Sequence, residues 1–186
     1  LVVSATRAPQ DPATLPLAVE VIGGAALREA PALTLDDTLR RSAAFSLFRR
    51  TGSLTANPTA QGVSLRGIGP SGASRALVLL DGVPVNDPFG GWIAWSKLPV
   101  STLERVEIVR GGGSPAWGGA SLGGVVHLLS APLLPAPSSA DFVTNSGTKR
   151  LEPVAGQLSA TVGDFRTRAA EASATLATPS GSDAFR

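Results

Sequence analysis

The stretch GIGPSG, from Gly67 to Gly72, has the glycine spacing of a dinucleotide-binding loop. In such a loop a helix begins directly after the glycines, and its N-terminus holds the pyrophosphate. Here the apolar run ASRALVLLDG follows, which is typical of a strand, and Pro70 fixes a turn inside the motif. The second glycine-rich stretch, GGGSPAWGG, lacks the Gly-Lys-Ser/Thr ending of a phosphate loop. We therefore interpret both stretches as connections between strands and expect no bound nucleotide.

The side chains that could perform catalysis are few and isolated. His127 is the single histidine and alternates within the strand-like run GVVHLLS, so a structural or interface role is expected for it. Ser71 and Ser114 lack the second glycine of a nucleophile elbow. Asp81 and Asp87 lie where turns are expected, and Asp is a common turn residue. We therefore predict that the chain is not an enzyme and has no catalytic residue, metal site or cofactor.

Composition sets the class of the protein. The 186 residues are 43% hydrophobic and 16% charged, enough for one ordinary domain with an appendage. The net charge is only +2 and the basic residues are scattered, which argues against a nucleic-acid partner. The absence of cysteine excludes disulfides and thiolate chemistry. No apolar run is long enough for a transmembrane helix.

The elements up to Ala131 predict an α+β domain, with a small mixed β-sheet and two or three short helices. A helix is expected over residues 34–45, with Thr34 as N-cap, Asp37 in capping-box position, and Leu35, Leu39 and Ala43 on one face. The run ALVLL predicts a strand covered on both faces. The expected strands cover residues 17–23, 45–50, 62–69, 75–82, the second half of 100–111, and 124–130.

Residues 110–124, RGGGSPAWGGASLGG, carry seven glycines in fifteen positions around Trp117. Glycine allows close backbone approach and positive φ, but costs entropy when it is ordered. Either something packs tightly against this stretch or the stretch must move. The sequence leaves these two alternatives open.

The tail differs in character from the domain before it. Residues 132–155 are rich in Pro and Ser and are interpreted as a linker. Residues 156–186 then alternate apolar and polar positions in segments of about ten residues, with a turn expected near Gly163 and Asp164. This alternation is the weak signature of transmembrane β-strands, and an ordinary surface hairpin is the alternative.

Several motifs in order resemble the plug domain of a TonB-dependent outer-membrane receptor: LVVSATR, TLDDTLRRS, GVSLRGIG, RALVLLDGVPVND and LERVEIVRGGGSPAWGGASLGGVVHLLS. The resemblance covers about residues 1–131. It implies an α+β plug domain followed by the first strands of a transmembrane antiparallel β-barrel, cut off after the first hairpin. The implied parts are a TonB-box-like segment and linker (1–12), the plug domain (13–131), a linker (132–155) and the first hairpin of a truncated barrel (156–186).

The chain also departs from the family pattern. The usual Pro-Gly after the second helix is replaced by SAAFSL, and the usual Pro after VRG is replaced by Gly112. The usual Tyr-Gly appears as Trp117-Gly118, and the usual Asn in the last strand of the domain is His127. These departures leave the expected fold unchanged.

The resemblance implies an active transporter in the outer membrane of a Gram-negative bacterium. The plug would lie inside its own β-barrel with the N-terminus in the periplasm, and the import substrate would be a ferric siderophore or a corrinoid. The alternative is a free-standing plug-like domain that binds a ligand or partner in the periplasm. The two differ in whether the gene continues past Arg186 with further alternating segments.

Two sets of site residues follow from the resemblance. LVVSATR resembles the TonB box, which would add as a strand to the periplasmic domain of TonB; a frayed terminus is the alternative. The residues expected to bind TonB are Leu1, Val2, Val3, Ser4, Ala5 and Thr6.

The ligand is expected to meet two outward-facing loops, Thr51 to Ala60 and Pro84 to Trp95. Their mixture of aromatic and polar side chains suits a bulky amphipathic ligand. The alternative is that the tryptophans pack on the barrel wall. The expected ligand-binding residues are Asn57, Asn86, Asp87, Phe89, Trp92 and Trp95.

Overall fold

The computed structural model describes residues 7–49, 51–65, 67, 74–131, 154–162, 168–177 and 184–185. The chain divides into two compact units, Leu1–Ser130 and Ala131–Arg186. Each unit is considered by itself. No helix within the described ranges is long and apolar enough to cross a membrane.

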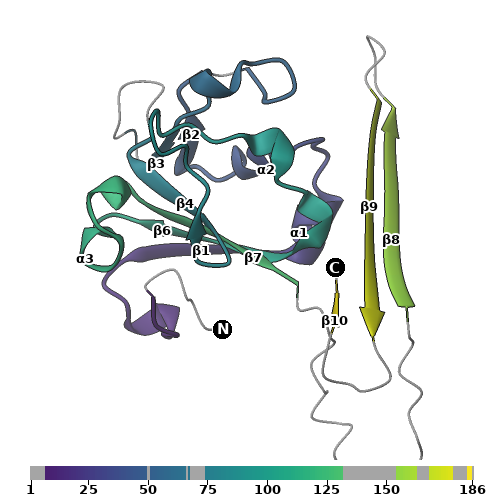
Figure 1. The fold of residues 1–186 in the computed structure, drawn as a ribbon. Coiled ribbons are helices and arrows are strands. Elements are labelled where there is room, and N and C mark those ends of the chain that lie inside the picture. Colours follow the sequence, from purple (N-terminus) through teal and green to yellow (C-terminus); the bar gives the residue numbers. More distant parts are fainter. Residues whose placement is uncertain are drawn as a thin grey trace, which may run out of the picture. The chain divides into compact units, whose positions relative to one another are not determined.

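A five-stranded mixed sheet forms the centre of the first unit, with strand order β1-β6-β7-β4-β5 (Figure 1). The central β4 and β7 run parallel, while β1–β6, β6–β7 and β4–β5 are antiparallel. The strands are β1 (Ala18–Gly23), β4 (Ala76–Leu80), β5 (Val83–Pro84), β6 (Leu103–Arg110) and β7 (Gly124–Ser130). The prediction of a small mixed sheet with short helices is confirmed.

Alternation along the strands gives the sheet two buried faces. The first face carries the even-numbered apolar residues of the central strands, and short elements from the first half of the chain cover it (Figure 1). These elements are α1 (Gly24–Glu29), α2 (Leu35–Leu39), β2 (Phe45–Leu47) and β3 (Val63–Leu65), and the last two form a separate antiparallel pair.

The second face carries the odd-numbered residues and a smaller apolar cluster. Leu77, Leu79, Val109 and Val125 are buried there, and Leu17, Val19, Val21 and Trp117 pack against them. Because β4 contributes to both clusters, the expectation that ALVLL is covered on both faces is confirmed.

Short turns and helices connect these strands. The glycine-rich stretch between β6 and β7 contains α3 (Ser114–Trp117). Single 3-10 turns occur at η1 (Pro12–Thr14), η2 (Pro58–Ala60), η3 (Trp95–Lys97), η4 (Val100–Thr102) and η5 (Gly119–Ser121).

The helix predicted over residues 34–45 is much shorter. It ends at Leu39, after which i→i−3 hydrogen bonds tighten the chain into turns that lead to β2. Leu35 and Leu39 are fully buried as expected, but Ala43 lies beyond the helix and is exposed. Thr34 stands at the N-cap position without a side-chain cap. Its hydroxyl instead donates to Asp37 Oδ2, 3.2 Å away, so the capping-box expectation is wrong.

A further difference is the helix α1, which lies where no helix was expected. Its six residues follow β1 directly, without a polar N-cap side chain, because Gly23 takes that position. Only one large apolar side chain of α1, Leu27, reaches the core. A helix this short has too little periodicity to be detected.

The second unit contains a long antiparallel hairpin. Strand β8 (Val154–Val162) pairs with β9 (Arg168–Ala177), which also pairs with the two-residue β10 (Ala184–Phe185). The hairpin register runs from Val154 opposite Leu176 to Val162 opposite Arg168. The expected turn at Gly163 and Asp164 lies outside the described residues.

Candidate functional site

The loop 84–95 is fixed to the central sheet by Asn86. Its Oδ1 accepts a hydrogen bond from Val78 N at 2.7 Å, and its Nδ2 donates to the carbonyls of Ala76 (3.2 Å) and Gly91 (3.3 Å). Strand β5 is only two residues long, and beyond its end the Asn86 side chain supplies hydrogen bonds to the backbone of β4. Both ends of the amide are therefore occupied, and Asn86 positions the loop.

Asp87 shapes the tip of the same loop. Its Oδ1 accepts from Phe89 N at 3.0 Å and from Gly90 N at 2.7 Å, and its backbone carbonyl accepts from Gly91 N at 2.8 Å. This turn leaves Phe89 97% exposed, a high value for a phenylalanine side chain. The turn therefore presents one aromatic ring to the outside of the unit.

The two tryptophans of the loop occupy different environments. Trp92 is half-buried, and its ring covers Gly90 so closely that a Cβ there would lie 1.6 Å from Trp92 Cζ3. Trp95 is only 1% exposed and packs edge-on against Phe45, with ring centroids 5.7 Å apart. The structure thus places Trp95 in the core of the unit, where its side chain cannot meet a ligand without unpacking. Of the two expected tryptophan contacts, only Trp92 lies partly at the surface.

Hydrogen bonds to Asp36 of α2 and to Arg40, which follows it, fix the loop 51–60. Asp36, fully buried at the start of the helix, accepts from Ser53 N (3.1 Å) and from Ser53 Oγ (2.6 Å). Arg40 Nη2 donates to Thr51 O at 2.9 Å. Asn57 is exposed, and its Oδ1 accepts from the backbone and the hydroxyl of Thr59. No role was expected for Asp36, and no local pattern indicates its long-range contact.

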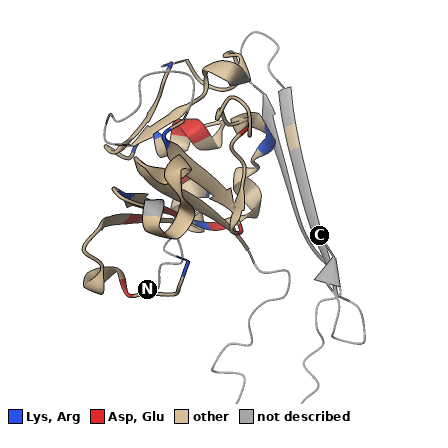
Figure 2. Ribbon diagram, turned by 60° about the vertical axis from the view of Figure 1, so that its left-hand side comes forward, with Lys and Arg blue, Asp and Glu red and all other residues tan. Residues whose placement is uncertain are grey.

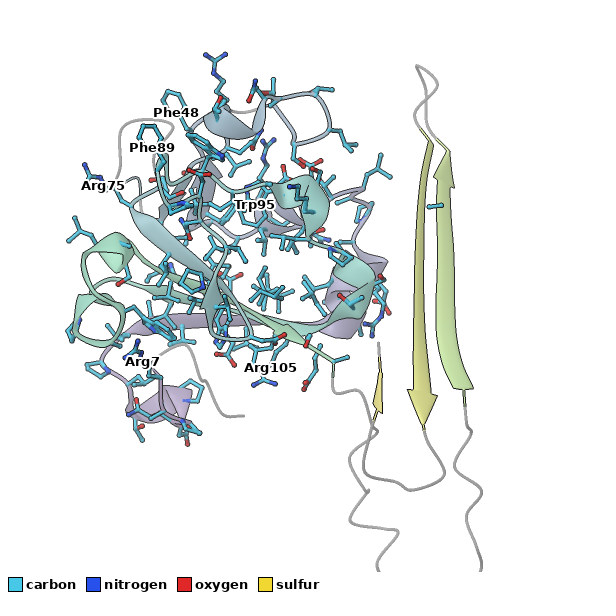
Figure 3. The ribbon with its side chains drawn as sticks, viewed as in Figure 1. Arg7, Phe48, Arg75, Phe89, Trp95 and Arg105 are labelled. Atoms are coloured by element: carbon cyan, nitrogen blue, oxygen red, sulfur yellow. The ribbon has the colours of Figure 1, made fainter. Side chains whose placement is uncertain are left out.

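Two exposed aromatic rings come from different parts of the chain. Phe48, 48% exposed, follows β2, and Figure 3 shows it at the same end of the unit as Phe89. Sequence reasoning missed Phe48, although the alternation that turns Phe45 and Leu47 inward also turns position 48 outward. A phenylalanine at an outward-facing position of this alternating segment is therefore the sequence signal that could have identified Phe48.

Charged residues are interspersed over the described part of the first unit. Figure 2 shows blue and red segments mixed, without a single large basic block in that part. Within the described ranges, no group of three or more His, Cys, Asp or Glu residues could hold a metal ion.

A buried polar group lies on the second face of the sheet. Glu107 is fully buried and accepts from Arg105 Nε at 2.9 Å, and His127 on the paired strand places Nδ1 4.0 Å from Glu107 Oε2. Burial lowers the pKa of His127 from its ordinary value. Glu107 and Asp81 oppose this shift, and Arg105 adds to it. His127 is a buried strand residue, in agreement with the structural role expected for it.

The residues expected to bind TonB, Leu1 to Thr6, lie outside the described residues. Arg7 is the first residue that the structure describes, and its guanidinium carbon lies 4.5 Å from the centroid of the Trp117 ring. Trp117 belongs to the glycine-rich stretch and packs against the apolar cluster of the second face. The structure therefore brings Arg7 and the glycine-rich stretch together.

Comparison with known proteins agrees with this fold. The vitamin B12 transporter BtuB of Vibrio vulnificus (strain CMCP6) is 29% identical over 130 residues, which cover 70% of this chain and 20% of that protein. The siderophore receptor PirA of Acinetobacter baumannii matches with a TM-score of 0.54 at 21% identity, over 85% of this chain and 22% of PirA. A mutant of the ferric enterobactin receptor PfeA from Pseudomonas aeruginosa gives a TM-score of 0.50 at 23% identity, over 70% of this chain and 19% of PfeA. At these identities the two structures show the fold alone.

The family model for the TonB-dependent receptor plug domain matches residues 11–125, more than half of the chain. The chain spans about a fifth of the length of the BtuB relative. The matched residues include β1, β4, β5 and β6, the first two residues of β7, and both loops described above. The chain belongs to the TonB-dependent receptor plug domain family.

Proposed function

We propose that this chain is the plug region of a TonB-dependent transporter that imports a bulky, scarce nutrient across the outer membrane of a Gram-negative bacterium. The observation that carries the proposal is the plug-family match over residues 11–125, together with the mixed sheet that those residues form. The similar proteins are named as a vitamin B12 transporter and as siderophore receptors. The proposed substrate is therefore a corrinoid or a ferric siderophore.

The second unit supports a barrel as the rest of the transporter. Strands β8 and β9 contain nine and ten residues, close to the length that a tilted strand needs to cross a bilayer. They pair antiparallel along their whole length, and their sequences alternate apolar and polar positions. We propose that this hairpin is the first of the barrel, which would place the plug in the lumen with its N-terminus in the periplasm.

We further propose that the two loops supply the plug's contacts to the ligand. Phe89 and Trp92 are the main candidates, since Phe89 is exposed, Trp92 lies partly at the surface, and the turn at Asp87 is hydrogen-bonded to both residues. Asn57 lies exposed on the other loop. Asn86 and Asp87 would act by positioning the loop, and Trp95 by supporting it from the core. Residues 1–6 are proposed to bind the periplasmic domain of TonB.

The test is a binding measurement on the receptor expressed from its complete gene. Ferric enterobactin and cyanocobalamin would be titrated separately, and binding followed by quenching of tryptophan fluorescence. We expect one class to bind, and Phe89→Ala or Trp92→Ala to weaken that binding by about 1 to 3 kcal/mol. Leu33→Ala serves as the control, because Leu33 is an exposed apolar residue that lies outside both loops.

Two outcomes would contradict parts of the proposal. If neither class of compound binds the folded receptor, the proposed import substrate is wrong. If a ligand binds and both aromatic variants match the parent and the Leu33 control, the loop 84–95 does not contact it. The function would then stand without this assignment of its site.

A further inference from the structure

The N-terminal strap, defined as residues 7–17, is attached at both ends to the second face of the sheet. At one end the Arg7 guanidinium lies 4.5 Å from the centroid of the Trp117 ring (Figure 3 labels Arg7). At the other end Leu17 packs into the second-face cluster with Trp117. Between them, η1 is capped by Asp11, whose Oδ1 accepts from Ala13 N at 3.0 Å. The strap is thus an ordered element.

Trp117 is well placed to hold the strap. Its ring packs against a cluster built from β4, β6 and β7, so the sheet fixes its position. Tryptophan is the strongest cation–π acceptor among the aromatic side chains, and arginine is its most frequent partner.

The backbone at Arg7 indicates that the contact is held in place. Arg7 has φ of 72°, in the left-handed region that non-glycine residues seldom adopt. Such a conformation persists only where the surroundings stabilise it. The stacking of the side chain on Trp117 is an interaction that can do so.

We propose that the Arg7–Trp117 contact is a latch that keeps the strap closed on the glycine-rich stretch 110–124. When Trp117 shifts, Arg7 loses its partner and the N-terminal end of the strap lifts from the sheet. When the strap is pulled away, the ring loses its cover and the stretch around it gains freedom. Any effect of the latch on a partner that binds residues 1–6 rests on the proposed function, whereas the latch itself does not.

The latch can be tested by amide hydrogen exchange on the 186-residue chain, without any partner. Arg7→Gln removes the cation at an exposed position, and Trp117→Leu removes the ring but keeps an apolar side chain. Each variant should raise exchange of residues 8–17 by about two- to five-fold, which corresponds to about 0.5–1 kcal/mol. Arg41→Gln, another exposed arginine, serves as the control and should leave the strap unchanged.

The double variant decides whether the two residues act through each other. If the latch exists, Arg7→Gln adds little once Trp117 is Leu, because both changes break one contact. Equal effects of Arg7→Gln in the presence and absence of Trp117 would overturn the proposal. So would unchanged exchange in Arg7→Gln, which would make Trp117 a packing residue only. Because no ligand or TonB takes part, these results do not depend on whether the transport function is correct.

Discussion

Replacing Gly124 by alanine should destabilise the first unit severely. Gly124 has φ of 134°, and a Cβ there would lie 2.2 Å from Val109 O and 2.9 Å from Leu65 Cδ1. The residue begins β7 and is paired with strands on both sides, opposite Arg110 and Ala76, so the backbone has little room to shift. The unfavourable conformation costs about 1–3 kcal/mol, and overpacking a further ~1–3 kcal/mol. Together they remove a large part of the ~5–15 kcal/mol that stabilises a typical domain.

Urea unfolding followed by tryptophan fluorescence measures this loss as a lower midpoint at unchanged slope. The matched control is Gly119→Ala in the same glycine-rich stretch, where an added Cβ meets no atom within 4 Å. This control should stay within about 0.5 kcal/mol of the parent. If Gly124→Ala were equally mild, the close approach at Gly124 would not be needed for folding, and the reasoning from packing would be refuted.

Three further predictions concern two charged groups on the second face and the N-terminal segment. Arg105→Met should lower the free energy of unfolding by about 2–3 kcal/mol, because it removes the cation that pairs with buried Glu107. Glu104→Gln removes the exposed partner of the same arginine and should cost under about 0.5 kcal/mol. Equal losses of the two variants in urea unfolding would contradict this. Burial lowers the pKa of His127 below 6.5, so as the pH falls the imidazole is protonated in the unfolded chain before it is protonated in the folded chain. Stability present above about pH 6.5 is therefore lost as the pH falls. His127→Asn should lose less stability than the parent between about pH 6.5 and 5, and parallel pH profiles of the two proteins would refute this. In the complete receptor, Val3→Pro should abolish energy-dependent uptake while ligand binding stays normal, because proline removes a backbone donor needed for strand addition; normal uptake would count against the TonB-binding assignment.

The strands of the first unit could be predicted from sequence because their patterns are local. Alternation and apolar runs identified β1, β4, β6 and β7, since each strand must bury one or both faces in a single sheet. The helix prediction over residues 34–45 failed at its end. Tertiary contacts decide where α2 stops: the turns after Leu39 direct Phe45 into the core beside Trp95. No spacing within the segment records that contact.

The candidate site was less predictable because it lies in irregular loops. Trp92 and Trp95 belong to the same loop, and without a regular period nothing in the sequence separates the surface ring from the buried one. Asn86 was expected to contact a ligand, yet its amide is hydrogen-bonded to the backbone of β4 and of Gly91. Polar side chains in loops serve both uses, and only the folded chain distinguishes them.

Close packing explains two of the glycines in the stretch 110–124. At its C-terminal end Gly124 is crowded by backbone, and nearer the start a Cβ at Gly113 would lie 2.8 Å from Val125 Cγ2. Around Trp117 the situation is reversed, since a Cβ at Gly118 or Gly119 would meet nothing within 4 Å. Close packing therefore requires glycine at Gly113 and Gly124, whereas the space at Gly118 and Gly119 would accept a Cβ. Trp117 lies between crowded Gly113 and open Gly118, and its ring packs on the second-face cluster while the Arg7 guanidinium covers it.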